Sequence, residues 1–326
     1  MFQSADRDLA PRSSEFWQAN RVPFSPLYPR VRFARWLHTD SEENYRRRGN
    51  RALSTESVGY SFNSLGYRGP EFERSSGDGA ILFVGDSNTF GLGMPYERLW
   101  TSLVTGSVAE LQKRRVHQFN LGFGATGSDY VAMVIHQSID ALRPDAVCVL
   151  WPSRARITWF PTPRRQVFFL PEWKPGIDTA EHDAFLRLAT DAQGFFNFVR
   201  NFQLVRSRLA ERGIPYFWGL LDPLPTDILD AYTGLDGHVG SWDPVDKARD
   251  GRHAGIRTHA AFAAAMVDAM ERADGARPDA ARAAAPSPRY PTPTRPAGPQ
   301  SDRLPRIVRR TITATRLRRR VRALRR

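Results

Sequence analysis

The chain has 326 residues, which is enough for one large domain or two small ones with a full hydrophobic core. Eleven arginines and one aspartate lie between residues 301 and 326, so most of the formal net charge of +13 belongs to this tail. The other 300 residues have 36 basic and 33 acidic side chains, and this near balance argues against nucleic-acid binding by the main body. A single cysteine, Cys148, excludes an intramolecular disulfide, and no stretch reaches the roughly 20 apolar residues of a membrane-spanning helix.

Residues 1–57 have no regular hydrophobic pattern. Four prolines precede residue 30, and a charged stretch runs from residue 40 to residue 51. Aromatic side chains are nevertheless scattered through the segment, and such side chains tend to be buried. We therefore expect an irregular N-terminal extension that lies against the main domain.

From residue 58 to residue 275, apolar runs alternate with segments of helical periodicity. The expected strands are residues 81–84, 116–121, 146–151 and 214–221. The expected helices are residues 96–114, 128–142, 183–212 (with a break at Gly194 and a stop at Gly213) and 258–270. Alternation with short connections predicts an α/β domain in which helices cover both faces of a parallel sheet. Cys148 falls in the third strand and is expected to be part of the core.

Residues 154–176, between the third strand and the long helix, are rich in aromatic residues and proline. Residues 156–160 and 166–170 are expected to form a hairpin. Two interpretations are open for this segment: an aromatic insertion that packs on the domain, or a flap over the functional site.

The C-terminal region differs in composition from the rest of the chain. Residues 276–305 are rich in proline and alanine, which predicts a disordered linker. Residues 306–326 place apolar side chains roughly along one helical face among many arginines, as in a basic amphipathic tail. Such a tail could contact an anionic membrane surface, a nucleic acid or an acidic partner, or remain solvated. Because the N-terminus lacks the apolar core of a secretory signal, a cytoplasmic location is expected, with peripheral contact to the membrane left open.

Two short segments carry side chains suited to nucleophilic catalysis. Ser87 follows the first expected strand within the sequence Gly85-Asp86-Ser87, at the strand end where α/β sheets bind ligands. His253 can act as the base that a serine nucleophile needs, and Asp250, three residues earlier, can orient its imidazole. Asp86 is interpreted as a brace for the turn. The sequence thus predicts the triad Ser87, His253 and Asp250.

These segments resemble the sequence blocks of the SGNH (GDSL-type) hydrolase superfamily. The matching segments are residues 63–69, 85–93, 120–127 and 250–255, within a resemblance that spans roughly residues 60–272. The resemblance implies a flavodoxin-like three-layer α/β/α sandwich with a central parallel sheet. It also implies ester chemistry without a metal or an organic cofactor, since members of the superfamily are mostly esterases, lipases and carbohydrate O-deacetylases.

The resemblance further implies an oxyanion hole with three donors, and two of the three positions differ here. The first donor is the backbone N–H of Ser87. The second is expected from a glycine in the family's second sequence block, here residues 120–127. Ala125 stands at the position of that glycine, and Gly124 beside it is a further candidate. The third is expected from an asparagine side chain that follows the third strand, and this chain has Ser153 at that position. The side chains that could substitute for the asparagine are those of Ser153, Arg154 or Arg156.

The sequence therefore predicts an SGNH-type serine esterase that hydrolyses an O-acyl ester, of carbohydrate or lipid-like character, through an acyl-enzyme. Two alternatives remain open. The same triad could transfer the acyl group to another hydroxyl, or the domain could be a catalytically degenerate binding module. The histidines show no metal-ligand spacing, so no metal site is expected. His259 on the last helix is expected either to be structural or to support the catalytic residues from behind.

Overall fold

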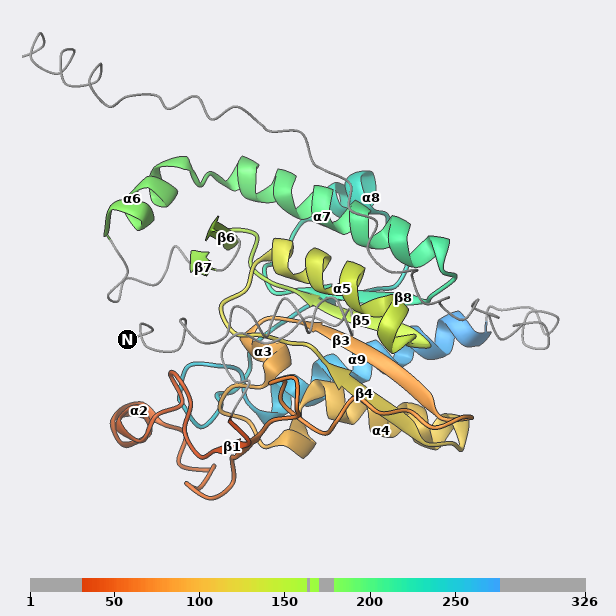
Figure 1. Ribbon diagram of the computed structural model, residues 1–326, viewed down its shortest axis with the longest axis horizontal. Helices are drawn as coiled ribbons and strands as arrows, with labels where there is room; N and C mark the ends of the chain where they lie inside the picture. The colour runs from red at the N-terminus through yellow and green to blue at the C-terminus, as the bar shows by residue number, and fades with distance from the viewer. Residues whose placement is uncertain (1–30, 163–164, 170–178, 276–326) are drawn as a thin grey trace, which may run out of the picture. The chain divides into compact units, whose positions relative to one another are not determined.

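The computed structural model describes residues 31–162, 165–169 and 179–275 (Figure 1). The chain divides into two units, Met1–Pro278 and Asp279–Arg326, and every described residue belongs to the first. The expected linker at 276–305 and the basic tail at 306–326 lie outside the described residues, as do residues 1–30 of the N-terminal extension. Among the helices that are described, none is long and apolar enough to cross a membrane.

The centre of the described domain is a five-stranded parallel sheet in the order β4-β3-β5-β8-β9. Its strands are β3 (Gly79–Gly85), β4 (Val116–Asn120), β5 (Ala146–Trp151), β8 (Tyr216–Leu220) and β9 (His238–Ser241). Numbered by their place along the chain, these strands follow the flavodoxin-like order 2-1-3-4-5. Every residue of β3 and β5 is buried, as expected for parallel strands that are covered on both faces.

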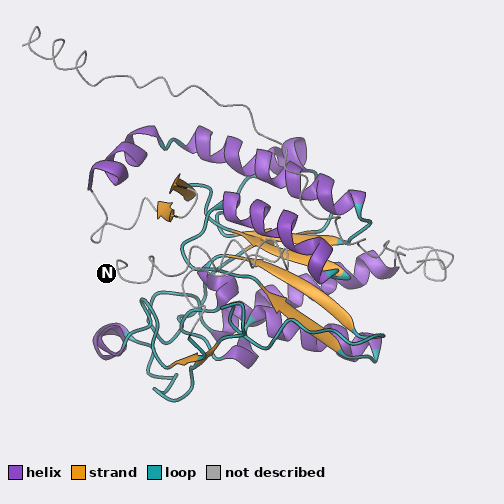
Figure 2. Ribbon diagram, in the orientation of Figure 1, coloured by secondary structure: helices purple, strands orange, loops and turns teal. Residues whose placement is uncertain are grey.

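Helices cover both faces of the sheet, which makes the predicted three-layer α/β/α arrangement (Figures 1 and 2). Helices α5 (Ser128–Leu142) and α7 (Asp191–Glu211) lie on one face, and α4 (Trp100–Gln112) and α9 (Ile256–Gly275) lie on the other. Alternate side chains of β3 enter opposite halves of the core: Leu82 packs with α5 and α7, whereas Phe83 packs with α4 and α9. Cys148 is fully buried in the second of these halves, as predicted, and burial raises the pKa of its thiol.

The long helix expected over residues 183–212 is two helices, and the break expected at Gly194 is wrong. Helix α6 (Thr179–Leu188) ends before Thr190, whose hydroxyl caps α7 by accepting a hydrogen bond from Gln193. Gly194 lies inside α7, where its N–H donates to the Thr190 carbonyl. A Cβ at Gly194 would stand 2.6 Å from the carbonyl oxygen of Arg154, so this glycine serves a close approach of two backbones. The stop expected at Gly213 is confirmed by its positive φ of +63°.

The expected hairpin is present as β6 (Ile157–Thr162) and β7 (Arg165–Phe169), which pair antiparallel. The rest of this insertion, residues 170–176, lies outside the described residues, so the choice between a packed insertion and a flap stays open. The helix expected over residues 96–114 is divided into the 3-10 helix η1 (Tyr96–Arg98) and α4. Several elements were not predicted, mostly because they are short: β1 (Phe33–Ala34), α2 (Glu42–Arg48), β2 (Tyr60–Ser61), α3 (Ser87–Phe90), α8 (Thr226–Thr233) and β9. Helix α3 begins directly at Ser87, before the glycine-rich turn.

Candidate active site

Ser87 is the first residue of α3, at the carboxyl end of β3. The Asp86 carboxylate caps this helix by accepting a hydrogen bond of 2.9 Å from the Asn88 N–H. Gly91, with a positive φ of +83°, ends the helix after one turn and donates its N–H to the Ser87 carbonyl. Gly85 has to be a glycine, because a Cβ there would stand 2.6 Å from the Leu150 carbonyl oxygen of the neighbouring strand. The turn therefore holds Ser87 at the end of the sheet where the carboxyl ends of the strands lie.

The structure brings the three predicted triad residues together. The Nε2 atom of His253 lies 2.9 Å from the Ser87 hydroxyl oxygen, although 166 positions separate the two residues in the sequence. The Nδ1 atom of His253 lies 2.7 Å from the Asp250 Oδ2. Both distances are within hydrogen-bond range, and the imidazole bridges a hydroxyl and a carboxylate through its two nitrogens. This is the arrangement of nucleophile, base and orienting acid that the Ser-His-Asp triad requires.

Asp250 is fully buried and accepts four hydrogen bonds. Its Oδ1 accepts the backbone N–H groups of Arg252 and His253, at 2.9 and 3.0 Å. Its Oδ2 accepts from the His253 ring and from the hydroxyl of Thr39, the latter at 2.8 Å. Burial alone would raise the pKa of Asp250, but the hydrogen bonds and the charge of His253 outweigh it and hold the pKa well below its usual range. The ionised carboxylate is therefore the favoured form of Asp250 in the folded protein.

Asp86 is placed as a brace for the nucleophile turn, as its sequence position indicated. Besides capping α3, its fully buried carboxylate forms an ion pair of 2.6 Å with the guanidinium of Arg156. Arg156 comes from the segment that follows β5, so this ion pair ties that segment to the turn that carries Ser87. Because Arg156 is held by Asp86, we regard it as a weaker candidate for the oxyanion hole than its sequence position suggested.

Three backbone N–H groups are candidate donors to an oxyanion at Ser87. The N–H groups of Ser87, Gly124 and Ala125 have no hydrogen-bond partner within the described part of the chain. Gly124 is adjacent to the nucleophile, since a Cβ on it would lie 4.0 Å from the Ser87 Cβ. Ala125 adopts the left-handed conformation, with a φ of +66°, which is uncommon for a residue other than glycine. The loop therefore keeps a glycine-like backbone at the position where the chain has alanine.

Among the contacts of the described residues, neither the Ser153 nor the Arg154 side chain makes a hydrogen bond to Ser87. The Ser153 hydroxyl accepts a long hydrogen bond of 3.4 Å from the Ala155 N–H. The Arg154 backbone N–H donates to Asp222 at 3.3 Å, while the Nη1 atom of its guanidinium is buried without a hydrogen-bond partner. An unpaired buried guanidinium nitrogen is costly, so Nη1 of Arg154 is a donor that a bound oxyanion could satisfy.

Two further observations concern residues outside the triad. His259 is structural, as expected: it is buried in α9, its Nδ1 accepts the Trp100 N–H at 3.1 Å, and burial lowers its pKa to about 3. Thr39 was not predicted to be near the site, because a single threonine in an irregular segment carries no sequence signal. No group of histidine, cysteine or acidic side chains in the described ranges could hold a metal ion.

No family model matches the chain, and no curated protein does. Among solved structures, TesA is similar at 14% sequence identity and a TM-score of 0.38, over 59% of this chain and 98% of that chain. The psychrotrophic esterase EstA from Pseudoalteromonas sp. is similar at 12% identity and a TM-score of 0.38, over 61% and 100%. A two-domain esterase active on acetylated mannans is similar at 14% identity and a TM-score of 0.39, over 61% and 50%.

At these identities and TM-scores, the assignment of the fold and of the site rests on the geometry of this chain. The solved structures to which the chain is similar also include one described as a putative lipolytic protein of G-D-S-L family and one described as a GDSL-like lipase.

Proposed function

We propose that the protein is a serine hydrolase that cleaves an O-acyl ester through an acyl-enzyme intermediate. The observation that carries the proposal is the continuous chain of hydrogen bonds from the Ser87 hydroxyl through His253 to Asp250, with distances of 2.9 and 2.7 Å. Serine is a weak nucleophile unless an adjacent base accepts its proton, and this geometry supplies that base together with the group that orients it.

The reaction has two halves. In the first, Ser87 Oγ attacks the acyl carbonyl while His253 Nε2 takes the serine proton, and His253 then protonates the leaving alcohol. In the second, His253 takes a proton from water, which attacks the acyl-enzyme carbonyl. His253 then returns this proton to Ser87 Oγ as the acyl–oxygen bond breaks and the acid is released. Asp250 fixes the tautomer of His253 by accepting a hydrogen bond from its Nδ1–H, and its negative charge stabilises the imidazolium that forms in each half.

The developing oxyanion would be stabilised by the backbone N–H groups of Ser87 and of Gly124 or Ala125. We propose Ser153 or Arg154 as the third donor, in place of the asparagine of the family. Losing one such donor typically lowers turnover by about 10²–10³-fold. Ser153→Ala and Arg154→Ala are therefore to be compared in the same ester assay, and equal turnover by wild type and both variants would contradict this assignment.

The nucleophile is tested with a fluorophosphonate probe, which labels an activated serine covalently. Wild type should be labelled and should hydrolyse 4-nitrophenyl acetate, whereas Ser87→Ala should do neither. The control is Ser107→Ala, at a half-buried serine of α4. Ser102, in the same helix, is less suitable because its hydroxyl donates a hydrogen bond of 2.7 Å to the Tyr96 carbonyl. Absence of Ser87-dependent labelling and turnover would favour a catalytically degenerate binding module instead.

The identity of the acyl acceptor follows from a second assay. The same acyl-enzyme can be resolved by water or by a hydroxyl of a saccharide, and the balance depends on how well the site excludes water. Release of acetate is to be measured with and without a saccharide acceptor, together with the appearance of acetylated saccharide. Hydrolysis predicts no acetylated product, and its accumulation would identify an O-acyltransferase.

A further inference from the structure

The N-terminal segment reaches the triad acid through one side chain. The hydroxyl of Thr39 donates a hydrogen bond of 2.8 Å to Oδ2 of Asp250, across 211 positions of sequence. This is the same carboxylate oxygen that accepts the Nδ1 proton of His253. The other oxygen, Oδ1, is held by two backbone N–H groups of the loop that carries the triad acid and base. Thr39 is thus the only side chain outside that loop that the described residues place on Asp250.

The position of Thr39 is fixed from both sides. The amide of Asn44, in helix α2, donates a hydrogen bond of 2.8 Å to the Thr39 carbonyl. The next residue, Asp40, is fully buried and forms a two-oxygen contact with the guanidinium of Arg249, at 3.0 and 2.6 Å. The hydroxyl of Tyr60 also donates to Asp40, and it accepts the N–H of Gly93.

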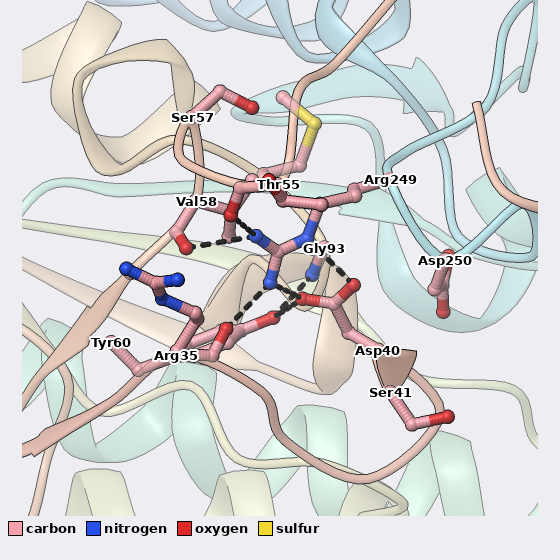
Figure 3. Close-up of polar contacts among 12 residues, drawn as sticks. Arg35, Asp40, Ser41, Thr55, Ser57, Val58, Tyr60, Gly93, Arg249 and Asp250 are labelled. Atoms are coloured by element: carbon pink, nitrogen blue, oxygen red, sulfur yellow. Dashed lines mark hydrogen bonds and ion pairs between the residues drawn. The ribbon is translucent and has the colours of Figure 1, made fainter. Parts of the chain in front are cut away.

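Arg249 is itself built into the same region, immediately before the triad acid. All five N–H groups of its guanidinium have partners: the two oxygens of Asp40 and the carbonyl oxygens of Arg35, Thr55 and Val58. Figure 3 shows these partners around the guanidinium, with Asp250 beside the cluster. The guanidinium also lies 4.0 Å from the centre of the Trp36 ring. A rotation of Arg249 would therefore break contacts to several residues between positions 35 and 58.

We propose that Thr39 is a positioning residue of the active site, set in place by the Asp40–Arg249 ion pair and acting on the reaction through Asp250. This inference rests on the proposed esterase function. A carboxylate that hydrogen-bonds an imidazole through one oxygen is best oriented when that oxygen also has a second, fixed donor. Without the Thr39 hydroxyl, Oδ2 faces His253 with one donor fewer to hold it, and the imidazole spends less time in the orientation that serves Ser87.

The test compares Thr39→Val with Thr39→Ser. Valine keeps the shape of threonine and removes the hydroxyl, whereas serine keeps the hydroxyl. We expect Thr39→Val to lower kcat for 4-nitrophenyl acetate about tenfold with KM unchanged, because the bond lost is one to a charged group that acts on the chemical step. Thr39→Ser should retain most of the wild-type kcat. Inactivation by the fluorophosphonate probe should slow in Thr39→Val by a similar factor.

Thr105→Val is the matched control, since Thr105 is half-buried and its hydroxyl donates to the Thr101 carbonyl within α4. It loses a hydrogen bond of similar length and should keep the wild-type kcat. If Thr39→Val does not fold, as judged by thermal unfolding, Thr39→Ala replaces it in the same comparison. Equal kcat in wild type and the hydroxyl-lacking variants, or failure of Thr39→Ser to restore kcat, would overturn the proposal.

The two proposals fail in different ways. A wild-type protein with no Ser87-dependent turnover would overturn the esterase function and this inference with it. A wild-type protein that depends on Ser87, with a Thr39→Val variant of equal kcat, would overturn only the role of Thr39.

Discussion

Asp40 and Arg249 form an ion pair in which neither side chain is exposed to solvent, and 209 positions of sequence lie between them. Removing one partner of a buried pair leaves the other charge buried without compensation, which typically costs about 3–5 kcal/mol. We therefore expect Asp40→Asn to lower the free energy of unfolding by roughly this amount, measured by urea denaturation.

The control is the exposed pair Glu42–Arg46 in helix α2, whose side chains are 56% and 75% exposed. Glu42→Gln should change the free energy of unfolding by about 0.5 kcal/mol or less, because exposed ion pairs contribute little. An equal loss of unfolding free energy in the two variants would show that the buried ion pair contributes no more to stability than the exposed one.

Much of the sheet and of the triad could be predicted from the sequence, for a definite reason. Strands β3 and β5 are apolar along their whole length because both faces are covered, and this leaves a clear pattern in the sequence. The proximity of the three candidate residues could be predicted because Ser87 and His253 lie in short segments with recognisable neighbours. A parallel sheet then brings strand ends and following loops to one edge, so segments distant in sequence meet there.

The N-terminal contribution to the site could not be predicted in the same way. Thr39 and Asp40 act through single long-range contacts, which leave no periodicity. Gly194 was misread as a helix break because glycine lowers helix propensity, whereas here its lack of a side chain admits the Arg154 carbonyl. The composition of a segment indicates only which secondary structure it prefers locally. The contacts of Thr39 and Asp40, and the place of Gly194 within α7, depend instead on the residues that pack against them from elsewhere in the chain.

The ion pair between Asp86 and Arg156 yields a second prediction. Arg156→Met leaves the fully buried Asp86 carboxylate unpaired beside the nucleophile, so we expect lower kcat and a loss of stability on the order of 3 kcal/mol. Adding Asp86→Asn removes the uncompensated charge and should recover part of the stability, because the two residues act as a pair. Unfolding by urea measures the double-mutant cycle, and simple additivity of the two single effects would contradict the coupling.

Ala125 yields a third prediction, because it occupies the left-handed region with a φ of +66°. Replacing alanine by glycine removes a steric cost of about 1–2 kcal/mol but adds a conformational entropy cost of about 0.5–1 kcal/mol. We expect Ala125→Gly to raise the free energy of unfolding by about 0.5 kcal/mol and to keep ester turnover, since glycine presents the same backbone N–H. Ala109→Gly, inside α4, should change stability in the opposite direction.

The lowered pKa of Asp250 yields a prediction for the pH dependence of stability. Its pKa in the folded protein lies below the value of about 3.9 for an unfolded aspartate, so the carboxylate contributes stability that is fully present above that value. The contribution is lost as the pH falls from there toward the folded pKa, because protonation then favours the unfolded chain. Asp250→Asn cannot titrate and lacks this contribution at every pH.

The free energy of unfolding of wild type and Asp250→Asn is therefore to be measured by urea denaturation at pH 7 and at pH 3. Wild type should be the more stable at pH 7, and the difference should shrink at pH 3, since only wild type takes up a proton at residue 250 on unfolding. Asp140→Asn is the comparison for a partly exposed carboxylate that pairs with Arg208 and Arg212 at the surface. A wild-type advantage that is the same at both pH values would show that the hydrogen bonds of Asp250 do not stabilise its charged form.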